Sequence, residues 1–454
     1  MGKYVCKNCG VDFKQKSHYD NHLNKKKPCK AIEAKIKDIK TTHEQFSDLS
    51  KSLTKQLDKK VIKQNGIFFT PFNIIKQTLS SVTRYCNKHG IQIKTILEPS
   101  CGSCEFIEYL DYSFNNTTID GIEFNNQIFE SIKGKYKEYG VSSSENNSIN
   151  LFNLDFLKTD DKKYDLIIGN PPYFVMSKKD VDNKFHDYFD GRPNIFVIFI
   201  LHSLKKLNDN GVLSFVLPKS FCNCTYYNKL RVHIYENYNI IDIIDCSKEK
   251  YLGTSQDTVI FTISNKTTND NKQFSFIKND IILFNTPENV QKLKYLYENT
   301  TTIEGLDLFV KVGNTVWNQE KDILTDDENF TRLIYSGDIK DNKLVLTKYK
   351  DEAKKNYINK EGESGPLLIV NRGYGVGTYK FDYCLIDIDK NYTIENHIIT
   401  IRSSIDISKE ELIKKYNFII KSFNNDKTKE FINLYCCNSA MNTNELQNIL
   451  PIYT

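Results

Sequence analysis

Arginine and long apolar runs are the two features that this sequence has least of. Six arginines stand against 56 lysines in 454 residues, and no stretch approaches the roughly 20 uninterrupted apolar residues that a membrane span requires. The first residues also lack the apolar segment of a secretory signal. These absences predict an intracellular, cytoplasmic protein with no membrane partner. Its twelve cysteines are therefore expected to be reduced thiols or metal ligands.

Two phosphate-binding patterns are missing as well. The string G-x-x-x-x-G-K-[ST] does not occur, which excludes a P-loop that cradles ATP. G-x-G-x-x-G is absent from the turn where a dinucleotide fold would carry it, which argues against a dinucleotide cofactor.

Positive charge is concentrated at the N-terminus. Residues 1–64 contain 16 lysines and 7 acidic residues, a net charge of +9, whereas the whole chain carries only +5. Such an arm is suited to a polyanion, and a solvated lysine-rich helix is the alternative.

The first 30 residues carry the ligand spacing of a ββα zinc finger. Cys6 and Cys9 form a C-x2-C pair, and twelve residues separate Cys9 from His22. Cys29 completes the set, although it is a cysteine at a position where a histidine is usual and follows His22 after six residues. A segment this short needs the metal to fold, so we predict structural Zn²⁺ here. Nucleic-acid contact and protein docking remain alternative roles for the finger.

Residues 31–63 are expected to form a helical connector. From Phe46 onward, apolar residues recur in steps of three and four, at Leu49, Leu53, Leu57 and Val61.

From Ile93 the chain alternates between short apolar runs and helical stretches, which predicts a doubly wound parallel sheet. The predicted strand 95–97 runs into a turn of an acidic residue, proline and small residues at 98–104, as in folds that cradle a nucleoside cofactor. A second strand, 118–122, ends at Glu123, which is placed to bind both hydroxyls of a ribose.

A third apolar run, 164–169, ends in Asn170-Pro171-Pro172-Tyr173. Here the chain resembles the S-adenosylmethionine-dependent DNA adenine methyltransferases. The motif order resembles their gamma group and the enzymes of type II restriction-modification systems. The resemblance implies that the Asn170 side-chain oxygen and the Pro171 carbonyl accept hydrogen bonds from the target amino group. It also implies that Tyr173 stacks on an adenine flipped out of the duplex.

The same resemblance implies the cofactor contacts. A closing segment, 66–71, would fold over the methionine end of S-adenosylmethionine, Glu98 would bind its amino group, and Asp155 and Phe156 would hold its adenine. The full predicted cofactor-binding set is Phe69, Thr70, Pro71, Glu98, Pro99, Ser100, Gly102, Glu123, Asp155 and Phe156. One departure from the family turn is Cys104, which stands where a glycine is usual and puts cofactor affinity in question.

The remaining residues suggest target recognition. Tyr251 is a candidate for stacking on the target base, and Trp317, Asn318, Arg372 and Tyr374 are candidates for DNA contact. We therefore expect a Rossmann-like catalytic domain over 64–268 and an α+β target-recognition domain over 269–454. No clear nuclease motif is present, so a separate cognate restriction endonuclease is the expected partner.

The sequence thus predicts a site-specific enzyme that methylates the 6-amino group of adenine in double-stranded DNA. Two alternatives stay open: a methyltransferase acting on RNA or protein glutamine, and an inactive zinc-finger DNA-binding protein. A finger beside this enzyme type also suggests a eukaryotic virus or its host, hence a nuclear or viral-factory location.

Overall fold

The computed structural model describes residues 4–6, 12–13, 15–24, 45–134, 147–266, 271–349, 354–372, 380–435 and 441–453. The chain divides into two compact units. The first unit comprises residues 1–222, 226–275 and 282–287, and the second comprises 223–225, 276–281 and 288–454. No helix within the described ranges is long and apolar enough to cross a membrane.

The N-terminal residues contain two short strands and a helix. Strand β1 (Tyr4–Val5) pairs antiparallel with β2 (Asp12–Phe13), and helix α1 (Lys16–Leu23) follows. The rings of Tyr4 and Tyr19 stack with their centroids 5.9 Å apart. The order of elements is therefore ββα, as expected for these residues.

Two helices occupy the described part of the predicted connector. Ser47 caps α3 (Asp48–Gln56) by accepting a hydrogen bond from the Ser50 amide, and Asp58 caps α4 (Lys59–Asn65) in the same way. Each cap satisfies an amide that a helix start leaves unpaired. Residues 31–44 of the connector lie outside the described residues.

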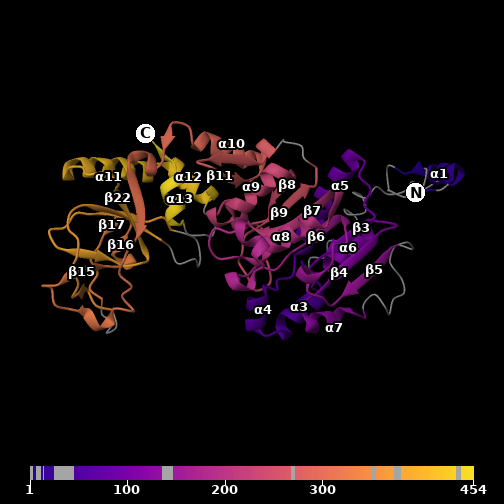
Figure 1. Ribbon diagram of the computed structural model, residues 1–454, viewed down its shortest axis with the longest axis horizontal. Coiled ribbons are helices and arrows are strands. Elements are labelled where there is room, and N and C mark those ends of the chain that lie inside the picture. The colour runs from indigo at the N-terminus through magenta and orange to yellow at the C-terminus, as the bar shows by residue number, and fades with distance from the viewer. Residues whose placement is uncertain are drawn as a thin grey trace. The chain divides into compact units, whose positions relative to one another are not determined.

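The first unit is built on a seven-stranded sheet with the order β5-β4-β3-β6-β7-β9-β8 (Figure 1). All neighbouring pairs from β5 to β7 are parallel, and β9 is the antiparallel strand between β7 and β8. The predicted doubly wound sheet is confirmed in these parallel strands. The bounds are β3 Thr95–Glu98, β4 Thr118–Ile122, β5 Ser148–Phe152, β6 Tyr164–Gly169, β7 Leu207–Pro218, β8 Asn239–Asp245 and β9 Thr258–Ser264.

The strand order reverses between β3 and β6. The chain moves outward from β3 to β4 and β5, and then returns to place β6 on the other side of β3. In doubly wound sheets, the loops that follow the two strands at such a reversal diverge and leave a crevice for a ligand. The turn after β3 and the Asn170-Pro171-Pro172-Tyr173 turn after β6 flank this point.

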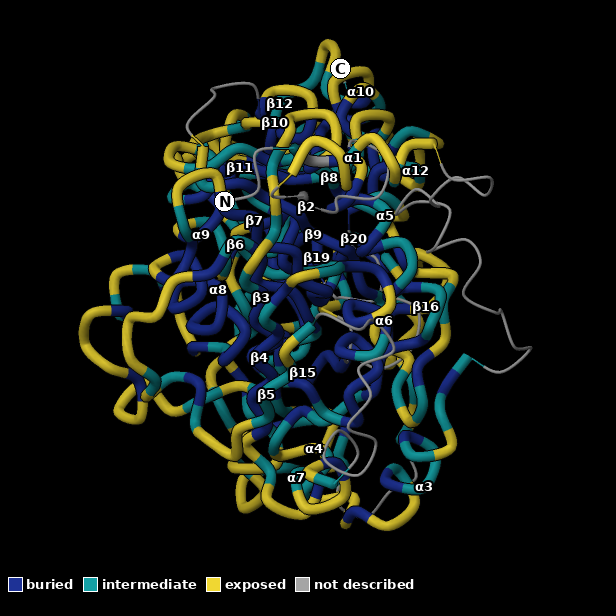
Figure 2. Tube along the Cα trace, turned by 90° about the vertical axis from the view of Figure 1, so that its right-hand side faces the viewer, coloured by how far each residue is buried: buried dark blue, intermediate teal, exposed yellow. Residues whose placement is uncertain are grey.

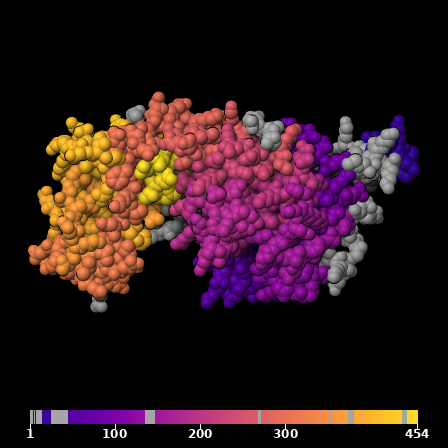
Figure 3. All heavy atoms as spheres, viewed as in Figure 1, coloured from indigo at the N-terminus to yellow at the C-terminus, as the bar shows by residue number. Residues whose placement is uncertain are grey.

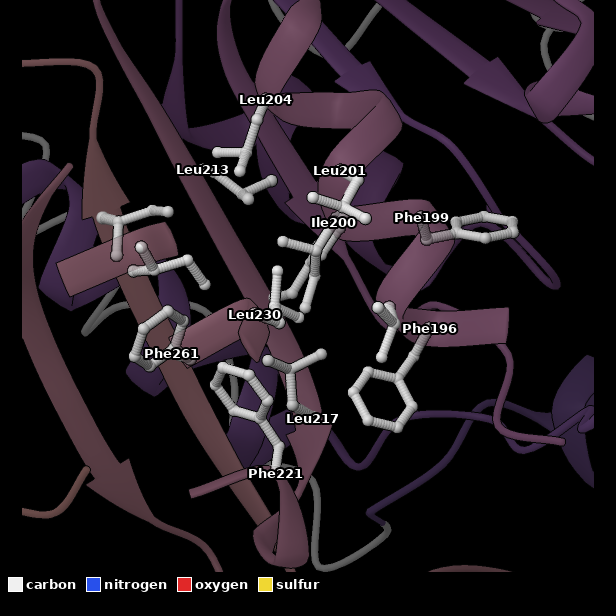
Figure 4. Close-up of a cluster of buried hydrophobic side chains, with 14 of the residues drawn as sticks. Phe196, Phe199, Ile200, Leu201, Leu204, Leu213, Leu217, Phe221, Leu230 and Phe261 are labelled. Atoms are coloured by element: carbon white, nitrogen blue, oxygen red, sulfur yellow. The ribbon is translucent and has the colours of Figure 1, made fainter. Parts of the chain in front are cut away.

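Helices cover both faces of the sheet because successive strand residues point to opposite sides. Leu166 and Ile168 of β6 pack toward α5 (Phe72–His89) and α6 (Glu105–Ser113), whereas Ile167 packs toward α8 (Ile195–Lys205) and α9 (Asn228–Asn237). Figure 4 shows α8 side chains pointing toward Leu213 and Leu217 of β7. Figure 2 shows the buried residues concentrated along β3, β4 and β6. Each large aliphatic side chain buried in this way contributes about 1.5–3 kcal/mol.

Helices α3 and α4 precede the sheet in sequence. Phe46, Leu53 and Leu57 form a small cluster with Phe69 and with Ile128 of α7 (Asn126–Ile132). Figure 3 shows the indigo residues of this part of the chain against purple residues that follow in sequence.

The second unit combines two four-stranded sheets with helices. One sheet has the antiparallel order β13-β22-β19-β20, and the other has the order β14-β18-β15-β21. The strands are β13 Leu308–Val312, β14 Leu324–Thr325, β15 Thr331–Ile334, β18 Tyr357–Ile358, β19 Leu367–Asn371, β20 Tyr383–Ile386, β21 Tyr392–Ile394 and β22 Ile398–Ser403. The helices are α11 Lys409–Phe423, α12 Asp426–Tyr435 and α13 Thr443–Asn448, together with α10 Pro287–Leu296, which begins at the boundary between the units.

Candidate active site

A cavity of about 250 Å³ lies at the reversal point of the sheet. Six chain segments supply its wall. They contribute Asn65–Phe69, Pro99, Ser100, Gly102, Glu123–Asn125, Ile128, Asp155–Leu157, Asn170, Pro172, Phe174, Met176, Ile195 and Phe199. Most of the predicted cofactor-binding residues are therefore brought to one cavity by segments far apart in sequence.

Glu98 is the last residue of β3 and is 2% exposed. Its Oε2 atom has no hydrogen-bond partner in the described part of the chain. Burial raises the pKa of the Glu98 carboxyl well above its usual value, and the nearby Cys104, Glu105 and Glu123 act in the same direction. An unsatisfied buried acceptor of this kind is costly unless a ligand supplies a donor.

Glu123 joins the end of β4 to the turn after β3. One of its oxygens accepts from the Gly102 amide at 2.9 Å and the other from the Asn125 amide at 2.6 Å. Burial raises the pKa of this carboxyl. Because each carboxylate oxygen has a second lone pair, the side chain retains capacity to accept from hydroxyl groups in the cavity.

Asp155 and Phe156 form the opposite wall. Asp155 caps the short helix η1 (Phe156–Lys158), with its Oδ1 atom accepting from the Leu157 amide at 3.1 Å. The Phe156 ring is 2% exposed and lies 5.0 Å from the ring of Phe199 on α8, centroid to centroid. The Phe156 ring is thus fixed by its packing against Phe199 in the hydrophobic core.

The turn after β3 is fixed to helix α3 by a buried polar cluster that the sequence analysis did not include. The hydroxyls of Ser47, Ser50 and Ser103 all donate to the Glu105 carboxylate, and the hydroxyls of Ser50 and Ser103 are 2.7 Å apart. The sequence could not predict this cluster, because serines are common in polar connectors. Their hydrogen bonds to Glu105 depend on how α3 packs on the turn.

Cys104 begins α6 with φ +70° and is completely buried. This is the left-handed conformation, in which a residue other than glycine is strained. Its side chain packs in the core on the α5–α6 face of the sheet and does not line the cavity.

Asn170 immediately follows β6 and is held through both ends of its side-chain amide. Its Nδ2 atom donates to the Phe68 carbonyl and to Thr70 Oγ1, each at 3.1 Å. Its Oδ1 atom accepts from the Tyr173 hydroxyl at 2.6 Å. In addition, the Ser100 hydroxyl donates to the Asn170 backbone carbonyl at 3.1 Å, which links the two turns that flank the cavity.

The Asn170-Pro171-Pro172-Tyr173 turn also packs tightly on the segment 66–71. Gly66 has φ +60°, and a Cβ atom there would lie 2.6 Å from the backbone nitrogen of Tyr173. Position 66 therefore needs glycine for its backbone angle and for this close approach.

Comparison with known proteins identifies the family. The Eco57I restriction-modification methylases match this chain over residues 13–252, which is more than half of its length and includes both turns. The chain belongs to this family. It is 28% identical to the type II methyltransferase M.CvrRI of Paramecium bursaria Chlorella virus XZ-6E, over 90% of this chain and 99% of the relative.

Two further comparisons extend the similarity. The modification methylase CviBIII of Paramecium bursaria Chlorella virus NC1A is 26% identical over 90% of this chain and 99% of its own. The solved DrdV–DNA complex shares the fold, with a TM-score of 0.55 at 11% identity, over 89% of this chain and 57% of the DrdV chain.

In this methylase, Tyr173 is bound through its hydroxyl as well as through its ring. The hydroxyl lies 2.6 Å from the Val216 carbonyl of β7, as well as from Asn170 Oδ1, and it can donate its single proton to one of them at a time. The ring stands edge-on to Phe196, with the centroids 6.1 Å apart. Burial raises the pKa of the hydroxyl well above its usual value, so it remains a donor at neutral pH.

Several predicted site residues of the methylase do not line the cavity itself. Thr70 bonds to Asn170, and Pro71 precedes the first residue of α5. Tyr251 is 9% exposed, and its hydroxyl lies 3.1 Å from Thr258 Oγ1. The complete set outside the cavity wall is Thr70, Pro71, Glu98, Pro171, Tyr173 and Tyr251.

The cavity wall also includes residues that were not predicted. Phe124 is the clearest case, because it is 66% exposed although it is a large aromatic side chain. Its position directly after Glu123 is a signal that could have found it. No sequence feature marks the other residues as part of a cavity, because apolar and capping residues of helices occur at such positions in any sheet protein. These residues are Asn125, Ile128, Ile195 and Phe199.

The predicted recognition residues lie in the second unit. The Trp317 ring stands edge-on to Tyr335 at 6.3 Å, and the Lys354 ammonium lies 5.9 Å from the Trp317 ring centroid. Asn318 and Arg372 are exposed, and Tyr374 lies outside the described residues.

Two of the four predicted zinc ligands can be located. Cys6 is buried directly after β1, and His22 lies in the last turn of α1. Cys9 and Cys29 lie outside the described residues. Within the described ranges, the finger residues included, no group of three His, Cys, Asp or Glu side chains that could hold a metal ion occurs.

Proposed function

We propose that this protein transfers a methyl group from S-adenosylmethionine to the 6-amino nitrogen of a flipped adenine in double-stranded DNA, at a short specific site. The observation that carries the proposal is the Asn170 side chain at the cavity wall, whose amide nitrogen donates to two partners and whose oxygen lies 2.6 Å from the Tyr173 hydroxyl. Family membership supports methyl transfer, and the N-P-P-Y order supports an amino target.

The cavity residues fit S-adenosylmethionine. This molecule carries a cationic sulfonium and an ammonium group, and it supplies the methyl group that is transferred. Glu123 and Asp155 are acidic side chains of the cavity wall, and Glu98, buried beside the lining residue Pro99, has an oxygen that lacks a donor. Carboxylates with pKa values raised by burial are stabilised by a cation beside them. The aromatic wall of Phe156 and Phe124 suits an adenine ring.

The chemical task of Asn170 and Pro171 is to make the amino group nucleophilic. An adenine amino nitrogen is a poor nucleophile because its lone pair is delocalised into the ring. Acceptors for both of its hydrogens favour a pyramidal nitrogen, whose lone pair is then directed at the methyl carbon. Bound S-adenosylmethionine would supply the methyl group to this nitrogen, while Asn170 and Pro171 would hold the two amino hydrogens. Tyr173 would stack on the base in the flipped position.

The remaining parts of the chain complete the proposal. We assign catalysis to residues 64–268 and target recognition to 269–454, with Trp317, Asn318, Arg372 and Tyr374 as candidate DNA contacts. Cys6, Cys9, His22 and Cys29 would bind one structural Zn²⁺. The gamma-group motif order and a separate cognate endonuclease also belong to this proposal.

The test is to incubate the purified protein with S-adenosylmethionine and unmethylated genomic DNA, and to map methylated bases by single-molecule sequencing. We expect N6-methyladenine within one short sequence. The Asn170→Ala variant should lose at least about 100-fold in turnover, or about 2.7 kcal/mol of barrier, and should still bind the cofactor. Methylation confined to RNA, to a protein glutamine or to cytosine would refute the adenine assignment.

A further inference from the structure

The closing segment 66–71 determines which end of the Asn170 amide faces the target. The Asn170 Nδ2 atom has two hydrogens, and its two partners are the Phe68 carbonyl and Thr70 Oγ1. A carbonyl oxygen only accepts hydrogen bonds, so the nitrogen end must face Phe68. The oxygen end consequently points the other way, where it meets the Tyr173 hydroxyl.

This segment is a firm support for the amide. Thr70 is 6% exposed, and the carbonyl of the next residue, Pro71, accepts the first backbone bonds of α5 from Ile74 and Ile75. The Phe72 amide donates to the Gln45 carbonyl at 2.9 Å, which ties the start of α5 to the residues before α3. Thr70 is thus fixed by its own backbone environment, and its hydroxyl is directed at Asn170.

We propose that Thr70 is a positioning residue for Asn170: the Phe68 carbonyl selects the nitrogen end of the amide, and the Thr70 hydroxyl, as the second partner of that nitrogen, limits rotation of the amide so that its oxygen is held in place for the amino group of the target base. The inference rests on the proposed function, and it gives Thr70 a role distinct from cofactor binding. Two observations favour this role: the hydroxyl has a partner in Asn170, and Thr70 is not among the described residues that line the cavity.

The experiment compares Thr70→Val, which replaces the hydroxyl with a methyl group of similar shape, with Thr70→Ser, which keeps the hydroxyl. Thr78→Val is the matched control, because Thr78 is also a buried threonine. Its hydroxyl donates to the Ile74 carbonyl within α5 and makes no hydrogen bond to Asn170. For each variant, the single-turnover rate of adenine methylation is measured at saturating cofactor, and the cofactor Kd is measured by calorimetry.

We expect Thr70→Val to slow the single-turnover step about tenfold, because loss of one amide partner lets the acceptor rotate out of line. The cofactor Kd should stay within about twofold, since the hydroxyl is not needed for that binding. Thr70→Ser should restore the rate to within about threefold of the wild type, and Thr78→Val should leave the rate unchanged. Thermal unfolding of each variant in the presence of cofactor identifies those that remain folded.

Three results would overturn the inference. An unchanged rate in folded Thr70→Val would remove the hydroxyl from the step, and a slow Thr70→Ser would show that the methyl group matters instead. A raised Kd with a normal rate at saturation would make Thr70 a cofactor ligand. Failure of the proposed function is recognised separately, because the wild-type protein itself would then not methylate adenine in DNA.

Discussion

Replacement of Cys104 by glycine and by alanine tests the most unusual backbone position of the cofactor turn. Cys104 has φ +70° and ψ +21° and is completely buried, although it is not a glycine. Alanine removes the sulfur but keeps the strained backbone. Glycine removes both the side chain and the strain.

The magnitude follows from three contributions. A residue with a Cβ in the left-handed region is disfavoured by about 1–2 kcal/mol, whereas glycine in an ordered segment loses about 0.5–1 kcal/mol through its larger backbone entropy. The buried Cβ itself contributes about 0.8 kcal/mol. These contributions nearly cancel, so the glycine and alanine variants at 104 should have free energies of unfolding within about 0.5 kcal/mol of each other.

The matched control is Ser80 in the middle of α5, where the backbone is helical. There, Ser80→Gly should be about 1 kcal/mol less stable than Ser80→Ala. The assay is urea unfolding of all four variants, monitored in the transition that S-adenosylmethionine shifts. The reasoning is refuted if the glycine variant at 104 has a free energy of unfolding about 1 kcal/mol below that of the alanine variant, as at position 80. Residue 104 would then not be in the left-handed conformation. Cofactor Kd should change little, since Cys104 does not line the cavity.

Two further predictions concern pH and salt. Burial, with the nearby Lys206, Lys184 and Lys205, lowers the pKa of His202 from 6.5 to about 4, so the folded protein keeps this imidazole neutral while the unfolded chain protonates it. Stability should therefore fall as pH drops from about 6.5 to 4, and it should fall less in His202→Gln. Equal loss of stability in both proteins, measured by urea unfolding, would contradict this. Deletion of residues 1–30 removes a net charge of +6 and should weaken binding to all DNA while keeping the methylated site, with a loss that shrinks as salt rises. A salt series with both proteins, together with site mapping, checks this, and a changed site would mean that the finger reads bases.

Buried strands were the most predictable part of the fold. Thr118–Ile122 and Tyr164–Gly169 have the predicted bounds, because each is an apolar run that ends at a polar or glycine-containing turn. The antiparallel direction of β9 could not be predicted, since a buried strand has the same apolar pattern whichever way it runs.

The connector shows a limit of periodicity. The apolar steps from Phe46 through Leu57 to Val61 continue without interruption, yet the chain forms two helices with Leu57 between them. Asp58 caps the start of the second helix. The apolar spacing does not reveal this break, because Leu57, which lies between the two helices, is buried like the apolar residues within them.

In the candidate site, the residues could be predicted from the sequence, whereas their hydrogen-bond partners could not. Glu98, Glu123 and Asn170 were identified because strand ends and the N-P-P-Y turn carry a pattern. One partner of the Asn170 amide nitrogen is the backbone carbonyl of Phe68, and a carbonyl is present at every position whatever the side chain. The close packing of Gly66 on the turn 170–173 brings it there.

The distance along the chain between Phe68 and Asn170 sets an order of events during synthesis. The two residues are 102 positions apart, and α5, β3, β4 and β5 are all made between them. A chain interrupted before residue 170 contains the closing segment and the first acidic residues of the cavity, but it has no amide for that segment to orient. The hydrogen bond between these two residues is therefore absent from every nascent chain that has not yet reached residue 170.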